Sequence, residues 1–239
     1  MHKLLSLIHR VLLRLKPYKK LIISLGLDSR WYKQYYRTLH FDTTNRISEG
    51  EVDGYKDESN DERIVQLVNL IFQNVSNPRS ILDLGCGTGR YLKQMRTVYP
   101  DAHFEGVDIS SEIVETFTRH MVPGIPVHVL DIETDETFHV QNREKFDLVC
   151  MIGIIQILSL GKIHRILDKV NRLMKDGGYL YVQFNTETKE KKSSVGYKRY
   201  AIDELGKLLE DHGFEIINGS RTDILKDYAY IIARKLHVN

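Results

Sequence analysis

Apolar and polar positions follow two different patterns of spacing along most of the chain. Short, almost wholly apolar runs are typical of buried β-strands, and they occur at 80–84, 103–107, 127–130, 146–151 and 178–184. Apolar residues at helical spacing lie between these runs, at 89–98, 111–121 and 160–174. Strands that alternate with helices predict an α/β fold, in which a mostly parallel sheet has helices on both faces and a ligand site at the carboxyl ends of its strands.

The same pattern of apolar and polar residues indicates where the domain begins and ends. A capping box at Ser59 and Glu62 predicts the start of a helix. Beyond the fifth strand, the pattern adds a helix and two further strands, at 202–211, 214–217 and 227–233. We therefore predict one Rossmann-like α/β domain over 61–239, preceded by an amino-terminal helical cap region over 1–60.

The first 25 residues predict a basic amphipathic helix, or two helices broken near Pro17. Leu4, Ile8 and Val11 recur at helical spacing among Lys and Arg residues. Three roles stay open for residues 1–25: packing on the domain or on a second subunit, docking on an anionic membrane surface, and a flexible arm. No apolar run is long enough to cross a bilayer, so we expect a cytoplasmic protein that is soluble or peripheral at the membrane.

Composition narrows the range of partners. The 239 residues carry a formal net charge of +2, which does not indicate a general nucleic-acid-binding surface. Cys86 and Cys150 lack the spacing of metal ligands or of a disulfide framework. We expect packed thiols in a reducing compartment and no metal site, although a redox role stays open if the two strands are neighbours.

The segment from Ile81 to Gly89 carries the most specific chemistry. An apolar strand with one acid, Asp83, leads into three glycines at alternate positions. Such a turn lets the backbone approach a ligand closely at the start of the following helix. Arg90 stands where the dinucleotide fingerprint needs a glycine, and no Gly-Lys-Ser/Thr is present, so a P-loop is excluded. Asp83 would repel a pyrophosphate and favours a ligand with a cationic group.

Two more carboxylates end the next two strands. Asp108 lies about 20 residues beyond the glycines, where it is placed to accept hydrogen bonds from ribose hydroxyls. Asp131 follows the third strand and could accept a hydrogen bond from an adenine amino group. Each acid alone is readily explained as a helix cap or a turn residue. Their joint position at strand ends favours a nucleoside site.

Together these motifs resemble the class I S-adenosylmethionine-dependent methyltransferases, over about residues 60–235. The resemblance implies a seven-stranded sheet whose last strand is inserted antiparallel, with S-adenosyl-L-methionine as the cofactor. The cofactor-binding residues that it implies are Asp83, Gly85, Cys86, Gly87, Asp108, Ile109, Asp131, Ile132 and Met151. In this set, Asp83 and Gly85 hold the methionine part, Ile109 lies against the adenine, and Met151 lines the methionine side.

The family pattern fails after the fourth strand. Ile157 stands where many members that act on small molecules have a histidine, so no catalytic base is assigned. His139 is expected in a loop, and His164 and His212 are expected as solvated helix residues; none is predicted to be catalytic. A basic loop at 185–200 could bind an anionic acceptor.

The expected reaction is transfer of a methyl group to an oxygen or nitrogen of a small molecule or glycan precursor. Three alternatives stay open: a membrane-associated acceptor such as a quinone or lipid-linked glycan, a protein or RNA methyltransferase, and a non-catalytic module that binds the cofactor. We expect no nucleic-acid partner. Membrane contact or dimerisation would use residues 1–25.

Overall fold

The computed structural model describes residues 62–186, 198–222 and 228–237. The predictions for residues 1–61, and for most of the basic loop at 185–200, lie outside these ranges. The described elements in chain order are α4 (Glu62–Asn74), β1 (Ser80–Leu84), α5 (Arg90–Val98), β2 (His103–Asp108), α6 (Ser111–Ile113), η2 (Val114–Thr118), α7 (Arg119–Met121), β3 (Val127–Val129), α8 (Thr137–Gln141), β4 (Phe146–Ile152), η3 (Ile155–Ile157), α9 (Leu160–Leu173), β5 (Met174–Asn185), α10 (Ile202–Glu210), β6 (Phe214–Arg221) and β7 (Tyr228–Lys235).

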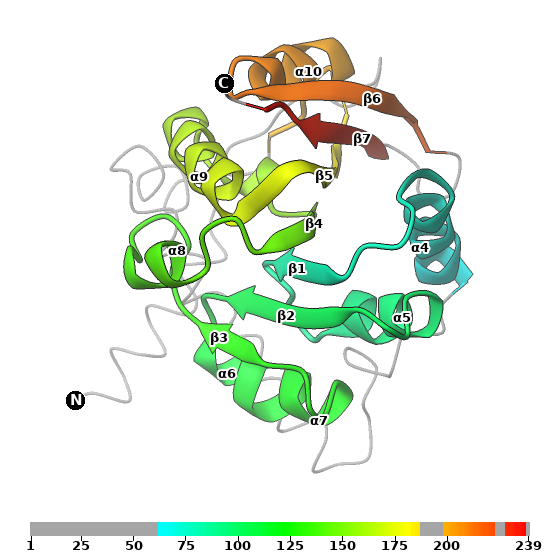
Figure 1. Cartoon of the computed structure of the whole chain (residues 1–239), viewed down its shortest axis with the longest axis vertical. Coiled ribbons are helices and arrows are strands. Elements are labelled where there is room, and N and C mark those ends of the chain that lie inside the picture. Colours follow the sequence, from blue (N-terminus) through cyan, green and yellow to red (C-terminus); the bar gives the residue numbers. More distant parts are fainter. Residues whose placement is uncertain (1–61, 187–197, 223–227, 238–239) are drawn as a thin grey trace, which may run out of the picture.

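The described strands form one seven-stranded sheet in the order β3-β2-β1-β4-β5-β7-β6. In Figure 1 this sheet extends from β3, in the lower part of the view, to β6 at the top. The strands β1 to β5 pair in parallel, and β7 lies antiparallel between β5 and β6. The predicted seven-stranded, mostly parallel sheet with an antiparallel last strand is therefore confirmed. Strand order changes direction between β1 and β4, and a crevice opens at the carboxyl ends of strands at such a switch point.

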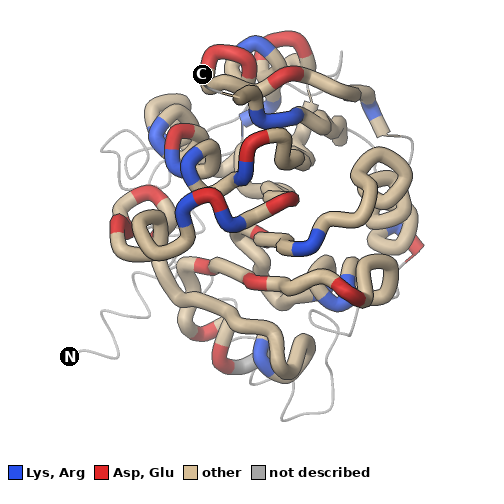
Figure 2. Tube along the Cα trace, in the orientation of Figure 1, with Lys and Arg blue, Asp and Glu red and all other residues tan. Residues whose placement is uncertain are grey.

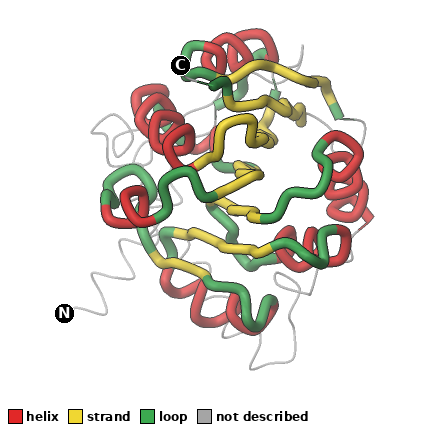
Figure 3. The backbone as a smooth tube through the Cα atoms, viewed as in Figure 1, coloured by secondary structure: helices red, strands yellow, loops and turns green. Residues whose placement is uncertain are grey.

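Helices cover both faces of the sheet, as Figures 1 and 3 show. The helices α4 and α5 bury Val68 and Leu92 in one apolar cluster, which includes Ile81 of β1. The helices α9 and α10 bury Leu167 and Leu205 in a second cluster on the opposite face. Successive residues of a strand point to opposite faces, so each central strand contributes to both clusters.

The predicted helix over 111–121 is interrupted. It begins as α6, continues through the π-helical turn η2 and ends as α7. The hydroxyl of Thr118 lies 3.3 Å from the carbonyl oxygen of Ile113, five residues earlier, and 2.6 Å from the carbonyl oxygen of Gly87. The wider turn thus directs Thr118 at the glycine-rich loop. π-Helical turns are frequent at functional sites.

The strands β5 and β6 are longer than their apolar runs predict. The residues at 174–177, expected as the end of a helix and a turn, belong to β5, where a bulge opposite Phe146 and Leu148 absorbs a shift in register. Gly177 takes a positive φ of 74° within this stretch. The strand β6 continues from 217 to Arg221 along the edge of the sheet. Both extensions are polar, which is why apolar patterning missed them.

Candidate functional site

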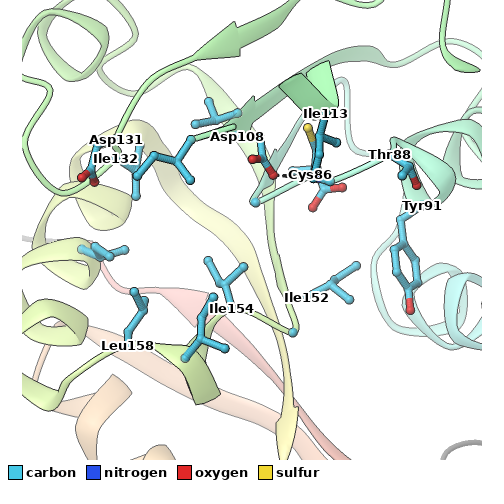
Figure 4. Close-up of a pocket in the computed structure, with 18 of the residues that line it drawn as sticks. Cys86, Thr88, Tyr91, Asp108, Ile113, Asp131, Ile132, Ile152, Ile154 and Leu158 are labelled. Carbon is cyan, nitrogen blue, oxygen red and sulfur yellow. Dashed lines mark hydrogen bonds between the residues drawn. The ribbon is translucent and has the colours of Figure 1, made fainter. Parts of the chain in front are cut away.

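A cavity of about 440 Å³ lies at the carboxyl ends of β1, β2 and β4. This volume is in the range of small-molecule sites. Figure 4 shows Asp131 and Ile132 at one end, Thr88 and Tyr91 at the other, and Asp108 between them. The side chains that line it are mainly carboxylates and glycines on one side and apolar residues on the other: Asp83, Gly85, Cys86, Gly87, Thr88, Arg90, Tyr91, Val107, Asp108, Ile109, Ile113, Leu130, Asp131, Ile132, Glu133, Ile152, Gly153, Ile154, Gln156, Ile157, Leu158, Ile166 and Tyr228.

The glycine-rich loop is held against β2 by its own backbone. The amides of Gly85 and Cys86 donate to the carbonyl oxygen of Val107, at 2.7 and 3.0 Å. Gly85 and Gly87 take positive φ angles of 75° and 53°. A Cβ on Gly85 would overlap the side chain of Ile154, whereas a Cβ on Gly87 would meet no protein atom within 4 Å. The exposed backbone of Gly87 therefore leaves space in the cavity for a ligand.

Asp108 connects this loop to the next helix. One carboxylate oxygen accepts a hydrogen bond from the amide of Gly87 (2.9 Å), and the other accepts one from the amide of Ser110 (2.8 Å). The hydroxyl of Ser110 in turn caps α6. Burial raises the pKa of Asp108, and the two backbone amides offset part of that rise. Each carboxylate oxygen can accept a second hydrogen bond, so Asp108 is able to bind a diol in the cavity.

Asp83 is the most unusual residue of the site. Its side chain is buried at the end of β1, and neither carboxylate oxygen has a hydrogen-bond partner in the part of the chain that the structure describes. Burial, together with the negative charge of Asp108, raises the pKa of Asp83 to about 7. An unpaired acid in an apolar strand is costly. A cationic ligand in the cavity would supply the missing partner.

The far end of the cavity is formed by the loop after β3. One carboxylate oxygen of Asp131 accepts a hydrogen bond from the amide of Glu133 (3.0 Å). Glu133 pairs with two cations of α9, Lys162 at 2.9 Å and Arg165. Figure 2 shows basic residues of α9 beside the acidic segment that leads into α8. These ion pairs fix the loop on α9 and so position Asp131 and the adjacent Ile132.

Comparison with known proteins finds a family match over part of the chain. Residues 81–178, less than half of the chain, match the family model of the methyltransferase domain. Over these residues the chain is similar to that family. The 1,6-didemethyltoxoflavin-N1-methyltransferase of Burkholderia thailandensis superposes with a TM-score of 0.62 at 16% identity, over 85% of this chain and 90% of that one. At that identity the superposition supports the fold alone.

Curated relatives match part of the chain. The malonyl-[acyl-carrier protein] O-methyltransferase of Bacillus cereus is 26% identical over 159 residues, which cover 58% of this chain and 56% of the relative. O-methyltransferase 3 of Dictyostelium discoideum is 23% identical over 125 residues, which cover 51% of this chain and 29% of the relative. The chain therefore spans about half or less of the length of these relatives.

Most of the residues predicted from the sequence to bind a cofactor lie together around this cavity. Eight of the nine line it, and Met151 is not among the lining residues. Met151 is fully buried in the apolar cluster that includes Leu84 and Val182, its neighbours on the adjacent strands. The residues that follow it, Ile152 and Ile154, line the cavity instead. A fully apolar strand end does not reveal which residue faces which side. The roles of all nine in cofactor binding stay predictions.

The histidines of the domain have structural partners. His139 lies in α8 rather than in a loop, and its Nε2 is 3.1 Å from the carbonyl oxygen of Ile132. His164 and His212 are not solvated separately as predicted: their ring nitrogens lie 2.9 Å apart, and His212 also contacts Asp168 at 2.8 Å. None of the three lines the cavity described above.

The two cysteines are free and buried. Burial raises the pKa of both thiols well above the usual value, with the charge of Asp83 as a further cause. Both side chains therefore stay protonated, and the expectation of packed thiols is confirmed. The position of Cys86 also explains why residue 106 is a glycine, since a Cβ on Gly106 would lie only 2.9 Å from the sulfur of Cys86.

Alanine substitutions in the loop should distinguish a glycine that is required for packing, Gly85, from one that leaves space for a ligand, Gly87. We expect Gly85→Ala to lower the free energy of unfolding by about 2–4 kcal/mol, because it adds an overlap with Ile154 to the strain of a positive φ. Gly87→Ala should lower it by only about 1 kcal/mol. Urea unfolding of the unliganded protein measures both. Equal losses would contradict the assigned contact.

Asp83 should make stability fall as the pH rises. The pKa of Asp83 is about 7 in the folded state and about 3.8, its ordinary value, in the unfolded state, so between these values the folded state holds a proton that the unfolded state has lost. Relative to wild type, Asp83→Asn should therefore gain about 2–3 kcal/mol in the free energy of unfolding between pH 5 and pH 8. Urea unfolding at both pH values, with the exposed Asp101→Asn as control, measures this difference. A pH-independent difference would contradict the prediction.

Proposed function

We propose that this chain binds S-adenosyl-L-methionine in the cavity and transfers its methyl group to an oxygen or nitrogen of a small molecule. The observation that carries the proposal is the buried, unpartnered carboxylate of Asp83 beside a cavity in a methyltransferase domain. The cofactor is a cation that carries an amino group, a sulfonium, a ribose diol and an adenine. Each of these groups has a suitable residue in the cavity.

The residues fit the cofactor in one direction along the cavity. Asp83 pairs with the cationic amino-acid part, and the backbone at Gly87 leaves space for its close approach. Asp108 accepts hydrogen bonds from the ribose hydroxyls through the lone pairs that Gly87 and Ser110 leave free. Asp131 and Ile132 meet the adenine edge and face at the far end (Figure 4).

The contribution of the chain to the reaction is orientation and exclusion of water. The bound cofactor supplies a methyl group on a positively charged sulfur. Ile113, Ile152 and Ile154 present an apolar wall that removes water from this region, and low polarity strengthens the pairing with Asp83. No histidine lines the cavity within the described residues, and Ile157 stands at its acceptor side. Positioning of the acceptor is what the described lining residues can contribute to the transfer.

Related proteins agree with oxygen or nitrogen as the acceptor atom. The relatives and neighbours include an O-methyltransferase for malonyl-[acyl-carrier protein], a (S)-coclaurine N-methyltransferase from Papaver somniferum and a toxoflavin-precursor N1-methyltransferase. Their named acceptors differ widely, so we infer only a small-molecule acceptor for this chain. Solved structures of this fold also include a [4+2]-cyclase. Turnover therefore has to be measured directly, in addition to binding.

Three finer predictions depend on residues outside the described ranges. An anionic acceptor would use Lys189, Lys191 and Lys192, whereas membrane contact or dimerisation would use residues 1–25. Within the described residues, no helix combines the length and the apolar character that a bilayer crossing requires. A cytoplasmic location and a peripheral membrane contact remain predictions from the sequence.

Removal of the Asp108 carboxylate tests the proposed cofactor site. We expect Asp108→Ala to weaken the binding of S-adenosylhomocysteine at least tenfold, because two hydrogen bonds from the ribose are lost. Calorimetry should compare this ligand with its 2′,3′-dideoxy analogue: wild type should discriminate between them, and the variant should not. Asp101→Ala, an exposed carboxylate, is the matched control.

Loss of affinity without loss of this discrimination would mean that Asp108 acts only through the loop that it holds. The same proteins test turnover. S-Adenosylhomocysteine should form from the labelled cofactor only when a low-molecular-weight extract is added, and Asp108→Ala should form less of it. Binding without any such product would leave a cofactor-binding module, and the absence of binding would refute the proposal altogether.

Cofactor affinity should also depend on pH through Asp83. The pKa of its carboxyl is about 7 without ligand, and pairing with a cation requires the ionised form. Affinity for S-adenosyl-L-methionine should thus rise about tenfold per pH unit from pH 5.5 to near 7 and level off by pH 8. Calorimetry in buffers of different ionisation enthalpy should detect close to one proton released near pH 6. Asp83→Asn should bind weakly at every pH, with no proton released.

A further inference from the structure

Three amide side chains are buried near the cavity with polar atoms that lack a partner. Gln156 is 3% exposed, Gln183 1% and Asn185 2%. The side-chain oxygens of Gln156 and Gln183, and the side-chain nitrogen of Asn185, have no hydrogen-bond partner within the described structure. Buried amides are normally paired, because burial without a partner costs free energy. Leucine would fill such positions in an ordinary core at no such cost.

Strand register places two of these amides beside the cavity. Gln183 of β5 lies level with Ile152 of β4, and Asn185 lies level with Tyr228 of β7. Residues level with one another on paired strands share a face of the sheet, as do residues two apart on one strand. Ile152 and Tyr228 both line the cavity. Because β5 lies between β4 and β7, Gln183 and Asn185 lie on the same face of the sheet as these two lining residues and directly behind the cavity wall, although they do not line the cavity themselves.

The third amide lies above the same region. Gln156 belongs to η3 and lines the cavity. Its side-chain nitrogen would lie 3.5 Å from a Cβ on Gly153, so its side chain folds back over the end of β4. The amide of Gly153 donates to the carbonyl oxygen of Gln183 at 3.0 Å, which fixes the end of β4 on β5. All three amide residues therefore lie at the ends of β4 and β5.

The side chains that β4, β5 and β7 place around these amides are uncharged. On this face, near the cavity, the described strands β4, β5 and β7 contribute Cys150, Tyr181, Tyr230 and Ile232 in addition to the residues above. The hydroxyl of Tyr181 also lacks a partner, and burial raises its pKa well above the usual value, so it stays neutral. The rings of Tyr181 and Tyr230 are stacked, with centroids 6.3 Å apart. These strands offer hydrogen bonds and aromatic contact. The charged groups nearby are Asp83 of β1, level with Cys150, and Arg199, which donates to the carbonyl oxygen of Thr186 at 3.0 Å.

We propose that Gln183, Asn185 and Gln156 recognise the methyl acceptor, and that this acceptor is an uncharged molecule with a planar edge of N–H and C=O groups, such as an amide, lactam or heterocycle. The inference rests on the proposed function, since it assigns the acceptor side of the same cavity. Side-chain amides pair in two-point fashion with edges of this kind, as they do with adenine in nucleic-acid recognition. A site with buried, unpaired amides rejects analogues that lack matching groups.

Small aromatic probes test this assignment with the full chain. Benzamide has the proposed edge, benzoate is its anionic equivalent, and acetophenone keeps the carbonyl but lacks N–H donors. Ligand-observed NMR titrations are carried out with and without saturating S-adenosylhomocysteine. Benzamide should bind at least tenfold more tightly than benzoate or acetophenone. Gln183→Leu and Asn185→Leu should each weaken benzamide binding at least tenfold.

Two controls separate recognition from structure. Gln73→Leu, at an exposed position of α4, should leave benzamide binding unchanged. Gln183→Leu should bind S-adenosylhomocysteine within twofold of wild type and unfold at no lower urea concentration, since it removes an unpaired polar group. If a leucine variant does not fold, the side-chain amide NMR signals of Gln183 and Asn185 in wild type decide the question: they should shift with benzamide and not with acetophenone.

Each outcome identifies which idea fails. Equal or tighter binding of benzoate would overturn the proposal and favour an anionic acceptor. Benzamide binding that is insensitive to both leucine variants, or that leaves both amide signals unmoved, would overturn it too. Absence of S-adenosylhomocysteine binding would refute the proposed cofactor site instead, and the probe titrations without that ligand would still report on the amides.

Discussion

A carboxylate without a counter-charge, buried at the centre of the sheet, is the constraint around which this site is built. Asp83 is the penultimate residue of β1. An apolar residue at this position would give a more stable strand. Burial and the charge of Asp108 raise the pKa of Asp83 to about 7, so the ionised form is disfavoured in the fold. The fold therefore gives up stability at a point where it can regain it by binding a cation.

The remainder of the glycine-rich loop is organised so that its open side faces this acid. Backbone hydrogen bonds fix Gly85 on β2, Asp108 holds the amide of Gly87, and Thr118 holds its carbonyl. The loop is thus restrained by groups from two elements, β2 and η2. Preorganisation of this kind lowers the cost of binding, because little of the loop has to be ordered when the ligand enters.

Sequence patterning predicted the strands, the sheet type and the acids at strand ends, because each depends on local spacing. It did not distinguish Met151, which is buried in an apolar cluster, from Ile152, which lines the cavity, since adjacent apolar residues at the end of a strand buried on both faces carry no sign of which face each occupies. It also missed Gln183 and Asn185, whose importance depends on the register of β5 against β4 and β7. The pair His164 and His212 joins residues 48 apart, a contact that no local pattern encodes.

The π-helical turn η2 has a consequence for how this fold could change. A turn of this type holds one more residue than an α-helical turn, so it rotates everything after it by about 100°. That rotation is what brings Val122 to within 3.3 Å of the position that a Cβ on Gly89 would take. Deletion of a single residue from η2 would restore regular helix yet turn Val122 away from the loop. Insertions and deletions here would thus reshape the side of the pocket formed by the glycine-rich loop while every residue of the loop itself is retained.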